Sequence, residues 1–411
     1  MSKRALLIGI PLVLIVGTAV LYFLIGGKAP AVTTIINNLP FGTPPAGSTN
    51  TLTNATGGSA GTSATSTNNG LTSDGKPLPK LFKISDAPVA GGVSFAKDGA
   101  THVHYTDRAT GHVFDVNLAT LEKQEILNTT MPKVYEALWK SDGSGFIART
   151  VDDGTDVIKN TSITIVAPKS TSTENTYTET ATLLRGTVSE LAVTPSGGLL
   201  YDLTDTGDFL ASTFLGEKPK TLFSMPFTDW RIMPANASTA LVYTKASGEA
   251  LGYAYKLNLS TGTMAKILGP LKDLTASLST DGKRVLFSYE DGGASNLSML
   301  NVGSQSATVI FPNTLPEKCV WSTKNTSAVY CGAPSGGVQA GETDLWYQGG
   351  VSFADRIWKI DMNTDATDLL ADPSTDFNTD IDMEKPFLSP SEDYLFFINK
   401  NDLSLWALKL S

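Results

Sequence analysis

The sequence predicts an all-β fold, a seven-bladed β-propeller of four-stranded blades, preceded by one transmembrane helix and a disordered linker. Three observations carry this prediction. An uncharged apolar segment lies near the N-terminus, a segment rich in Ser, Thr, Gly and Asn follows it, and a strand–turn–strand pattern then recurs to the end of the chain. The 411 residues are enough for one large all-β domain.

The N-terminal segment is predicted to anchor the chain in a membrane. Ala5–Gly27 carries no charge and is long enough to cross a hydrocarbon core of about 30 Å as a helix. Lys3 and Arg4 precede it, and basic flanks stay in the cytoplasm. We therefore expect residues 1–4 to be a cytoplasmic stub of a single-pass protein of the cell membrane, with the propeller outside the cytoplasm. The small residues Ala29–Ala31 leave cleavage of a signal peptide open as an alternative.

Residues 28–78 are predicted to form a flexible linker. No charged residue occurs from Ala29 to Ser73, and most of the segment consists of Ser, Thr, Gly, Asn and Pro. Such a composition buries too little apolar surface to offset the entropy lost when the backbone becomes ordered. We therefore expect this segment to tether the propeller to the membrane without a fixed structure.

The repeated pattern is clearest in LSTDGKRVLFSY, which runs from Leu278 to Tyr289. An alternating stretch enters Asp-Gly and a second apolar run leaves it, as in a β-hairpin. Related stretches recur roughly every 40–65 residues, and a period of this size with several strands per unit indicates a β-propeller. The seven copies begin at Val93, Ala137, Leu191, Trp230, Ala276, Cys319 and Pro386.

Each repeat except the last supplies four strands. A second strand follows the turn, a third follows a loop rich in Asp, Gly and Asn, and a fourth closes the unit. The last unit lacks a fourth strand, whereas KLFKI at Lys80–Ile84 precedes the first unit and belongs to none. We therefore predict a propeller over residues 79–411 in which Lys80–Ile84 completes the last blade, because this pairing removes an open sheet edge.

Two repeats, LSTDGKRVLFSYEDGG and LSPSEDYLFFIN, resemble the WD40-like repeat family, whose repeat reads approximately SPDGKxLxF. The family includes TolB-like proteins and the N-terminal propellers of prolyl oligopeptidase-type peptidases. The resemblance implies a propeller fold and carries over no catalytic residue. The Gly-His and Trp-Asp signature of WD40 repeats proper is absent.

Cys319 and Cys331 are predicted to form a disulfide. They lie at equal distances from a turn centred on Asn325, so an antiparallel hairpin places them opposite each other. The oxidising side of the membrane permits the bond. The alternative is a pair of reduced, buried cysteines.

The three histidines of the chain, His102, His104 and His112, all lie in the first repeat. His102 and His104 share one face of a strand, and His112 begins the next strand, so the three imidazoles are candidate zinc ligands. Chance clustering on a polar blade surface is the interpretation we favour. We therefore expect no metal site and no cofactor.

Repeat six and its connection to repeat seven contain the predicted binding surface. An unusually long connection between the second and third strands carries aromatic residues, and residues 372–385 are acidic. Both kinds of connection emerge on one face of a propeller, and aromatic anchors in a polar surround are typical of binding hot spots. The alternative is a packed loop that caps the blade. The acidic run fails the EF-hand pattern for calcium. The predicted binding residues are Trp346, Tyr347, Asp344, Asp376, Asp380, Asp382 and Glu384.

Composition limits the function further. The net charge of -9 argues against nucleic-acid binding, which needs basic residues to neutralise phosphates. We expect a membrane-anchored extracytoplasmic module that binds a protein or a cell-envelope ligand and is not an enzyme. The alternative is a carbohydrate-active enzyme, a glycosidase or lyase, at the channel mouth. Such an enzyme needs converging carboxylates, at least one with a raised pKa, and the acids of this sequence lie mainly in connections.

Overall fold

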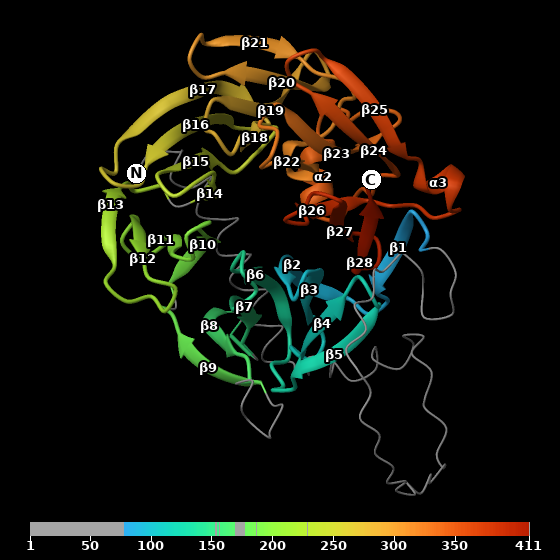
Figure 1. Cartoon of the computed structure of the whole chain (residues 1–411). Coiled ribbons are helices and arrows are strands. Elements are labelled where there is room, and N and C mark those ends of the chain that lie inside the picture. Colours follow the sequence, from blue (N-terminus) through green and yellow to red (C-terminus); the bar gives the residue numbers. More distant parts are fainter. Residues whose placement is uncertain are drawn as a thin grey trace, which may run out of the picture. The chain divides into compact units, whose positions relative to one another are not determined.

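The computed structural model describes residues 78–152, 154–155, 157–168, 177–185, 187–227 and 229–410. These residues form seven four-stranded antiparallel sheets, arranged as blades around a common axis (Figure 1). The predicted all-β, seven-bladed fold is therefore confirmed. The predicted membrane span and nearly all of the predicted linker lie outside the described residues. No helix in the described part of the chain is long and apolar enough to cross a membrane.

In blades one to six, four consecutive strands form a meander from the channel to the rim. Blade one contains β2 (Val89–Lys97), β3 (Ala100–Asp107), β4 (Val113–Asn117) and β5 (Glu122–Leu127). Blade two contains β6 (Val134–Trp139), β7 (Gly145–Val151), β8 (Ile158–Val166) and β9 (Thr178–Leu183). Blade three contains β10 (Val188–Val193), β11 (Leu199–Leu203), β12 (Asp208–Ser212) and β13 (Lys220–Ser224). Blade four contains β14 (Trp230–Pro234), β15 (Thr239–Thr244), β16 (Leu251–Asn258) and β17 (Met264–Lys272).

The remaining blades follow the same plan. Blade five contains β18 (Thr275–Leu278), β19 (Arg284–Asp291), β20 (Ala294–Asn301) and β21 (Ser306–Val309). Blade six contains β22 (Cys319–Trp321), β23 (Ala328–Pro334), β24 (Asp355–Asp361) and β25 (Ala366–Ala371). Blade seven contains β26 (Met383–Leu388), β27 (Tyr394–Asn399), β28 (Ser404–Lys409) and β1 (Leu81–Ser85).

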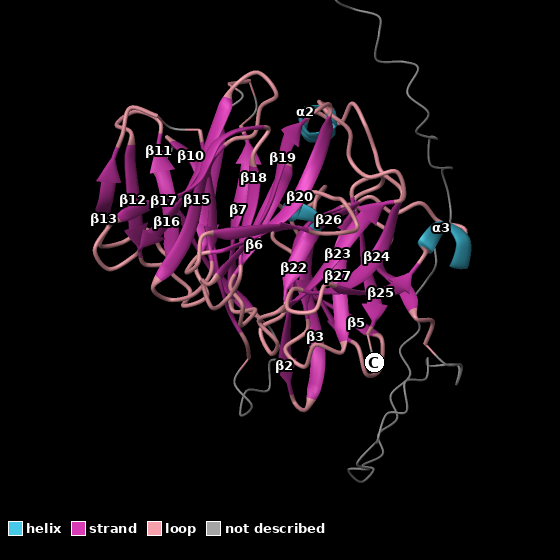
Figure 2. Cartoon of the chain, turned by 90° about the horizontal axis from the view of Figure 1, so that it is seen from above, coloured by secondary structure: helices cyan, strands magenta, loops and turns pink. Residues whose placement is uncertain are grey.

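Three short helical segments lie in the connections of blades five to seven. A 3-10 turn, η1 (Pro316–Lys318), leads into β22, and α2 (Glu342–Tyr347) lies between β23 and β24. The third, α3 (Pro373–Asp376), follows β25. In the side view, α2 lies at one end of the strands, so it covers one face of the propeller (Figure 2).

A buried hydroxyl group organises the repeated hairpin. Oγ of Ser279 accepts hydrogen bonds from the backbone N–H groups of Lys283 (3.2 Å) and Arg284 (2.9 Å) across the turn between β18 and β19. Gly282 in this turn has a φ of 69°, which favours glycine. Ser389 of blade seven binds two turn N–H groups in the same way, at 3.1 and 3.0 Å. The Ser or Thr that precedes the turn in these repeats therefore satisfies backbone donors that the tight turn leaves unpaired.

The N-terminal strand closes the ring. β1 pairs antiparallel with β28, with Leu81 opposite Leu408 and Phe82 opposite Ala407. Leu81 is buried in a cluster that also contains Phe397 of blade seven. The predicted closure of the last blade by Lys80–Ile84 is therefore confirmed, and β28 has no open edge.

Apolar clusters between neighbouring blades form the core. One cluster joins Leu241 and Tyr243 of blade four to Val285 and Phe287 of blade five. Another joins blade one to blade seven and includes Phe396. Because packing runs from blade to blade across the closure, the first strands that surround the channel are held on a rigid support.

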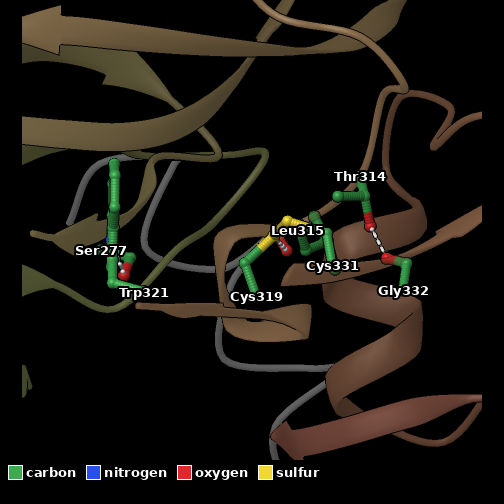
Figure 3. Close-up of a disulfide and its surroundings, with 7 residues drawn as sticks. All are labelled: Ser277, Thr314, Leu315, Cys319, Trp321, Cys331 and Gly332. Carbon is green, nitrogen blue, oxygen red and sulfur yellow. Dashed lines mark hydrogen bonds between the residues drawn. A yellow bond between two sulfur atoms is a disulfide. The ribbon is translucent and has the colours of Figure 1, made fainter. Parts of the chain in front are cut away.

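The predicted disulfide is confirmed. Cys319 of β22 lies opposite Cys331 of β23, their Cα atoms are 4.1 Å apart, and the sulfurs are bonded (Figure 3). Beside it, Nε1 of Trp321 donates a hydrogen bond to Oγ of Ser277 in blade five at 3.0 Å. The disulfide thus lies in the buried contact between blades five and six.

Loss of this disulfide is expected to lower the free energy of unfolding by about 3 kcal/mol at most, because the closed loop is short. The separation of the cysteines is 12 residues. Urea unfolding with and without reductant measures the effect. A Cys319→Ala, Cys331→Ala variant is the control, since its unfolding should not respond to reductant.

Candidate functional site

A cavity of about 570 Å³ lies in the central channel. Its wall is formed by the first strands of blades one, two, four and seven, which surround the axis in Figure 1. Most of the lining side chains are apolar, and they include Val93, Trp139, Ile232, Met233 and Phe387. These side chains are half-buried, so the channel presents apolar surface to solvent, although Trp139, Met233 and Phe387 also pack against the clusters between blades.

Glycine allows the channel wall to close between blades one and two. A Cβ atom at Gly91 would lie 2.0 Å from the carbonyl oxygen of Ala137, which is closer than any side chain tolerates. The register of β2 against β3 also shifts between Val89 and Gly91, as in a β-bulge. Nε1 of Trp139 donates a hydrogen bond to the carbonyl oxygen of Gly91 at 3.3 Å and fixes the indole in the wall.

A belt of alternating charges lies where the first strands begin. Nη1 of Arg149 and Nζ of Lys385 contact the carboxylate of Glu136 at 2.9 and 2.7 Å. Nη1 of Arg231 contacts the carboxylate of Glu190 at 2.9 Å. We define the charge belt as Glu136, Arg149, Glu190, Arg231, Glu317 and Lys385. It balances three acids with three bases, and Glu136 and Lys385 also line the channel cavity.

Glu317 joins the belt to the face covered by α2. The hydroxyl groups of Tyr243 (3.1 Å) and Tyr347 donate hydrogen bonds to Oε1 of Glu317. Burial raises the pKa of Glu317 despite these two donors. Burial likewise raises the pKa of both tyrosines, and the neighbouring Glu317 charge adds to that rise. The tyrosines therefore stay neutral and act as hydrogen-bond donors.

The two carboxylates of β6 and β10 behave differently. Burial disfavours ionised Glu136, but Lys385 and Arg149 together outweigh burial and lower its pKa. Burial dominates at Glu190 and raises its pKa, although Arg231 and Arg149 oppose it. Neither residue was predicted from the sequence as part of a site. The available signal was a charged residue within each of these otherwise apolar first strands.

Asp202 of β11 is hydrogen-bonded to the backbone of Glu190. Its Oδ1 accepts a hydrogen bond from the backbone N–H of Glu190 at 2.7 Å. The side chain is buried, and burial raises the pKa of Asp202 to about 6. The folded state therefore penalises its ionised form more than the unfolded chain does.

Asp202→Asn is expected to stabilise the propeller by about 3 kcal/mol at pH 7. The folded pKa of about 6 lies above the unfolded value. The penalty is therefore complete at neutral pH and disappears as the pH falls from about 6 to about 4. Urea unfolding of the two proteins at pH 7 and pH 4 should show a difference at the higher pH alone. Asp368→Asn on β25 is the exposed control; equal curves for Asp202→Asn and wild type at both pH values would contradict this account.

The structure buries Trp346, as the alternative of a packed loop predicts. Its side chain is only 4% exposed and packs with Leu315, Val338 and Phe353. Its Nε1 donates hydrogen bonds to both carboxylate oxygens of Asp382 at 3.0 Å. The ring caps the blade, which is the packing alternative, because the buried Asp382 provides the partner that its N–H group needs.

The other predicted binding residues do not form one cluster. Tyr347 is half-buried on Glu317, and Asp344 accepts a hydrogen bond from the N–H of Gly248 in blade four at 3.1 Å. Asp376 and Asp380 are exposed and bind within the turn around α3. Burial raises the pKa of Glu384. Among the described residues, the only side-chain hydrogen bonds within this set join Trp346 to Asp382. A binding role for the set stays a prediction.

The histidines form two separate groups. Nδ1 of His102 lies 2.8 Å and Nε2 of His104 lies 3.7 Å from Oδ1 of Asp115, which confirms that they share a strand face. His112 instead lies 3.0 Å from the carboxylate of Glu125. In the part of the chain that the structure describes, no group of three or more His, Cys, Asp or Glu residues is placed to hold a metal ion.

Comparisons with known proteins give the fold. No family model matches the chain, and no curated protein matches it. Oligogalacturonate lyase from Vibrio parahaemolyticus matches with a TM-score of 0.53 and 10% identity over 80% of this chain and 93% of that chain. Hydrazine synthase from Kuenenia stuttgartiensis gives 0.49 and 11% over 80% and 97%. TolB from Acinetobacter baumannii gives 0.37 and 16% over 77% and 78%. At such identities the likeness to the lyase shows a shared fold alone.

Proposed function

We propose that this protein is a membrane-anchored propeller that binds a protein or a cell-envelope ligand outside the cytoplasm, at the charged mouth of its channel. The anchor and orientation rest on the uncharged Ala5–Gly27 and the basic Lys3 and Arg4. We place the proposed binding site in the channel rather than at the aromatic connection of blade six. The reason is that Trp346 is buried, whereas the channel wall is accessible.

The channel cavity is the observation that carries the proposal. It combines an apolar wall with two ion-paired side chains, Glu136 and Lys385, in one concave site. Sites of this kind bind ligands through apolar contact and use a few polar groups for orientation.

A carbohydrate-active enzyme is the second candidate, on the strength of one observation. Glu190 and Glu317 are carboxylates with raised pKa values near the start of first strands. A general acid for glycoside cleavage needs such a pKa. Each carboxylate is, however, already engaged by Arg231 or by two tyrosines, so binding is the better-supported function.

Val93→Trp tests the channel as the binding site. Val93 is half-buried on the channel wall, so a larger ring fills the cavity without entering the core. We expect the immobilised full-length variant to bind the partner that wild type captures from membranes with about tenfold lower affinity, a loss of about 1.4 kcal/mol.

Val309→Trp is the matched control for that experiment. Val309 lies on the outer strand β21 and is 56% exposed, so the same change there leaves the channel open. Both variants should have the same melting temperature as wild type. Equal partner retention by all three proteins would overturn the channel as the binding site.

A further inference from the structure

A fully buried lysine lies between two fully buried aspartates. The side chains of Lys318, Asp355 and Asp382 all have 0% exposure. Nζ of Lys318 is hydrogen-bonded to Oδ1 of Asp382 and lies 2.7 Å from Oδ2 of Asp355. The amine nitrogen is therefore in contact with the carboxyl group of Asp382, the proximity that direct reaction between them requires.

The charges of this triad do not balance when all three groups are ionised. One ammonium faces two carboxylates, and no other cation is ion-paired with either carboxylate among the described residues. The rings of Trp346 and Phe353 lie 5.0 and 5.1 Å from the ammonium nitrogen. All three groups are fully buried, where unpaired charge is costly, and the second carboxylate is a base in contact with the amine.

Two N–H groups are directed at the carboxyl group of Asp382. Nε1 of Trp346 lies 3.0 Å from each of its oxygens, and the backbone N–H of Phe353 donates to Oδ2 at 3.1 Å. Donors in this position stabilise the negative charge that develops on oxygen when a nucleophile adds to a carboxyl carbon. The site thus holds a nucleophile, an electrophile and donors for the oxyanion.

We propose that Lys318 and Asp382 condense to an intramolecular isopeptide bond, with Asp355 as the proton relay. A proton first passes from the Lys318 ammonium to the Asp382 carboxylate. Nζ then attacks Cγ of Asp382, which forms the C–N bond. Asp355 accepts a proton from Nζ and returns it to the leaving hydroxyl group, the C–O bond breaks, and one water molecule departs. No oxidant or reductant takes part.

Asp355 suits the relay. Burial raises its pKa to about 6, although Lys318 opposes this rise. Its Oδ2 accepts from Lys318 and from the backbone N–H of Met383 at 2.7 Å, while its Oδ1 has no hydrogen-bond partner in the described structure. The group can therefore hold and release a proton near neutral pH while it touches the amine.

The bond would connect two blades covalently. Lys318 directly precedes β22 of blade six, and Asp382 directly precedes β26 of blade seven. Blade seven is also the blade that β1 completes. The cross-link would thus hold the ring closed beside its non-covalent junction.

Peptide mass mapping of the reduced full-length chain tests the proposal. In the cross-linked protein trypsin should not cleave after Lys318. The fragment that begins at Val285 should appear joined to the fragment that begins at Ile360, with the mass of one water missing. Cleavage after Lys318 with both fragments at full mass would overturn the proposal. A cross-link to the fragment that contains Asp355 would overturn the choice of Asp382.

Asp355→Asn tests whether proton transfer by Asp355 is needed for the cross-link. The amide keeps the shape of the side chain and leaves one ammonium with one carboxylate, so the variant should fold. We expect it to yield separate fragments at full mass, whereas wild type yields the joined pair. A joined pair in the variant would overturn the relay role of Asp355. The exposed pair Lys83–Asp402, 3.2 Å apart, is the internal control and should remain unjoined in both proteins.

Discussion

A chain that begins at Ala87 is expected to unfold about 4–6 kcal/mol more easily than one that keeps β1, and to associate with itself. The deletion removes the buried Leu81, the half-buried Phe82 and Ile84, and the hydrogen bonds to β28. It also exposes β28 as an open edge with a largely apolar sequence, SLWALK. Urea unfolding and light scattering measure the two effects.

A chain that begins at Leu78 is the matched control for this deletion. It lacks the same N-terminal segment but retains β1, so any difference between the two chains belongs to the strand. If both were monomeric with equal unfolding midpoints, the closure of blade seven by β1 would be refuted.

Trp346→Ala is expected to lower the free energy of unfolding by about 3–5 kcal/mol, as other buried aromatic truncations do. The ring is 4% exposed, and its loss leaves a cavity beside Leu315 and Phe353. It also removes the indole N–H donor from the buried carboxylate of Asp382. Of the two interpretations that the sequence left open for this connection, a loss of this size is the one that a packed loop predicts.

Leu345→Ala on the same helix is the control, because Leu345 is 48% exposed. Its unfolding should stay within about 0.5 kcal/mol of wild type. Thermal and urea unfolding of the two variants in parallel decide the question. If Trp346→Ala had the same free energy of unfolding as wild type, the packed-loop interpretation would be wrong and Trp346 would again be a candidate binding residue.

The parts of the fold that local patterns encode were predictable. The Asp-Gly turn at Asp281 and the hydroxyl of Ser279 mark the hairpin of blade five within a few residues. The pairing of Cys319 with Cys331 follows from counting across one turn. Closure by β1 also followed, because the repeat left one strand over at one end and lacked one at the other.

The candidate site was less predictable because its contacts join distant blades. Glu136 of β6 meets Lys385 of β26 only when the ring closes, and no spacing in the sequence indicates that pair. The sequence left open whether Trp346 belongs to a binding surface or to a packed loop. Its burial depends on Asp382, which the next connection places underneath it.

Oxidative footprinting of methionines with and without the captured membrane partner tests channel binding most directly. Met233 lines the channel cavity, whereas Met225 follows the outer strand β13 and is 38% exposed. Oxidation of each to the sulfoxide reports its access to solvent. We predict that the partner slows oxidation of Met233 and leaves Met225 unchanged. Protection of Met225 with unchanged oxidation of Met233 would contradict binding at the channel.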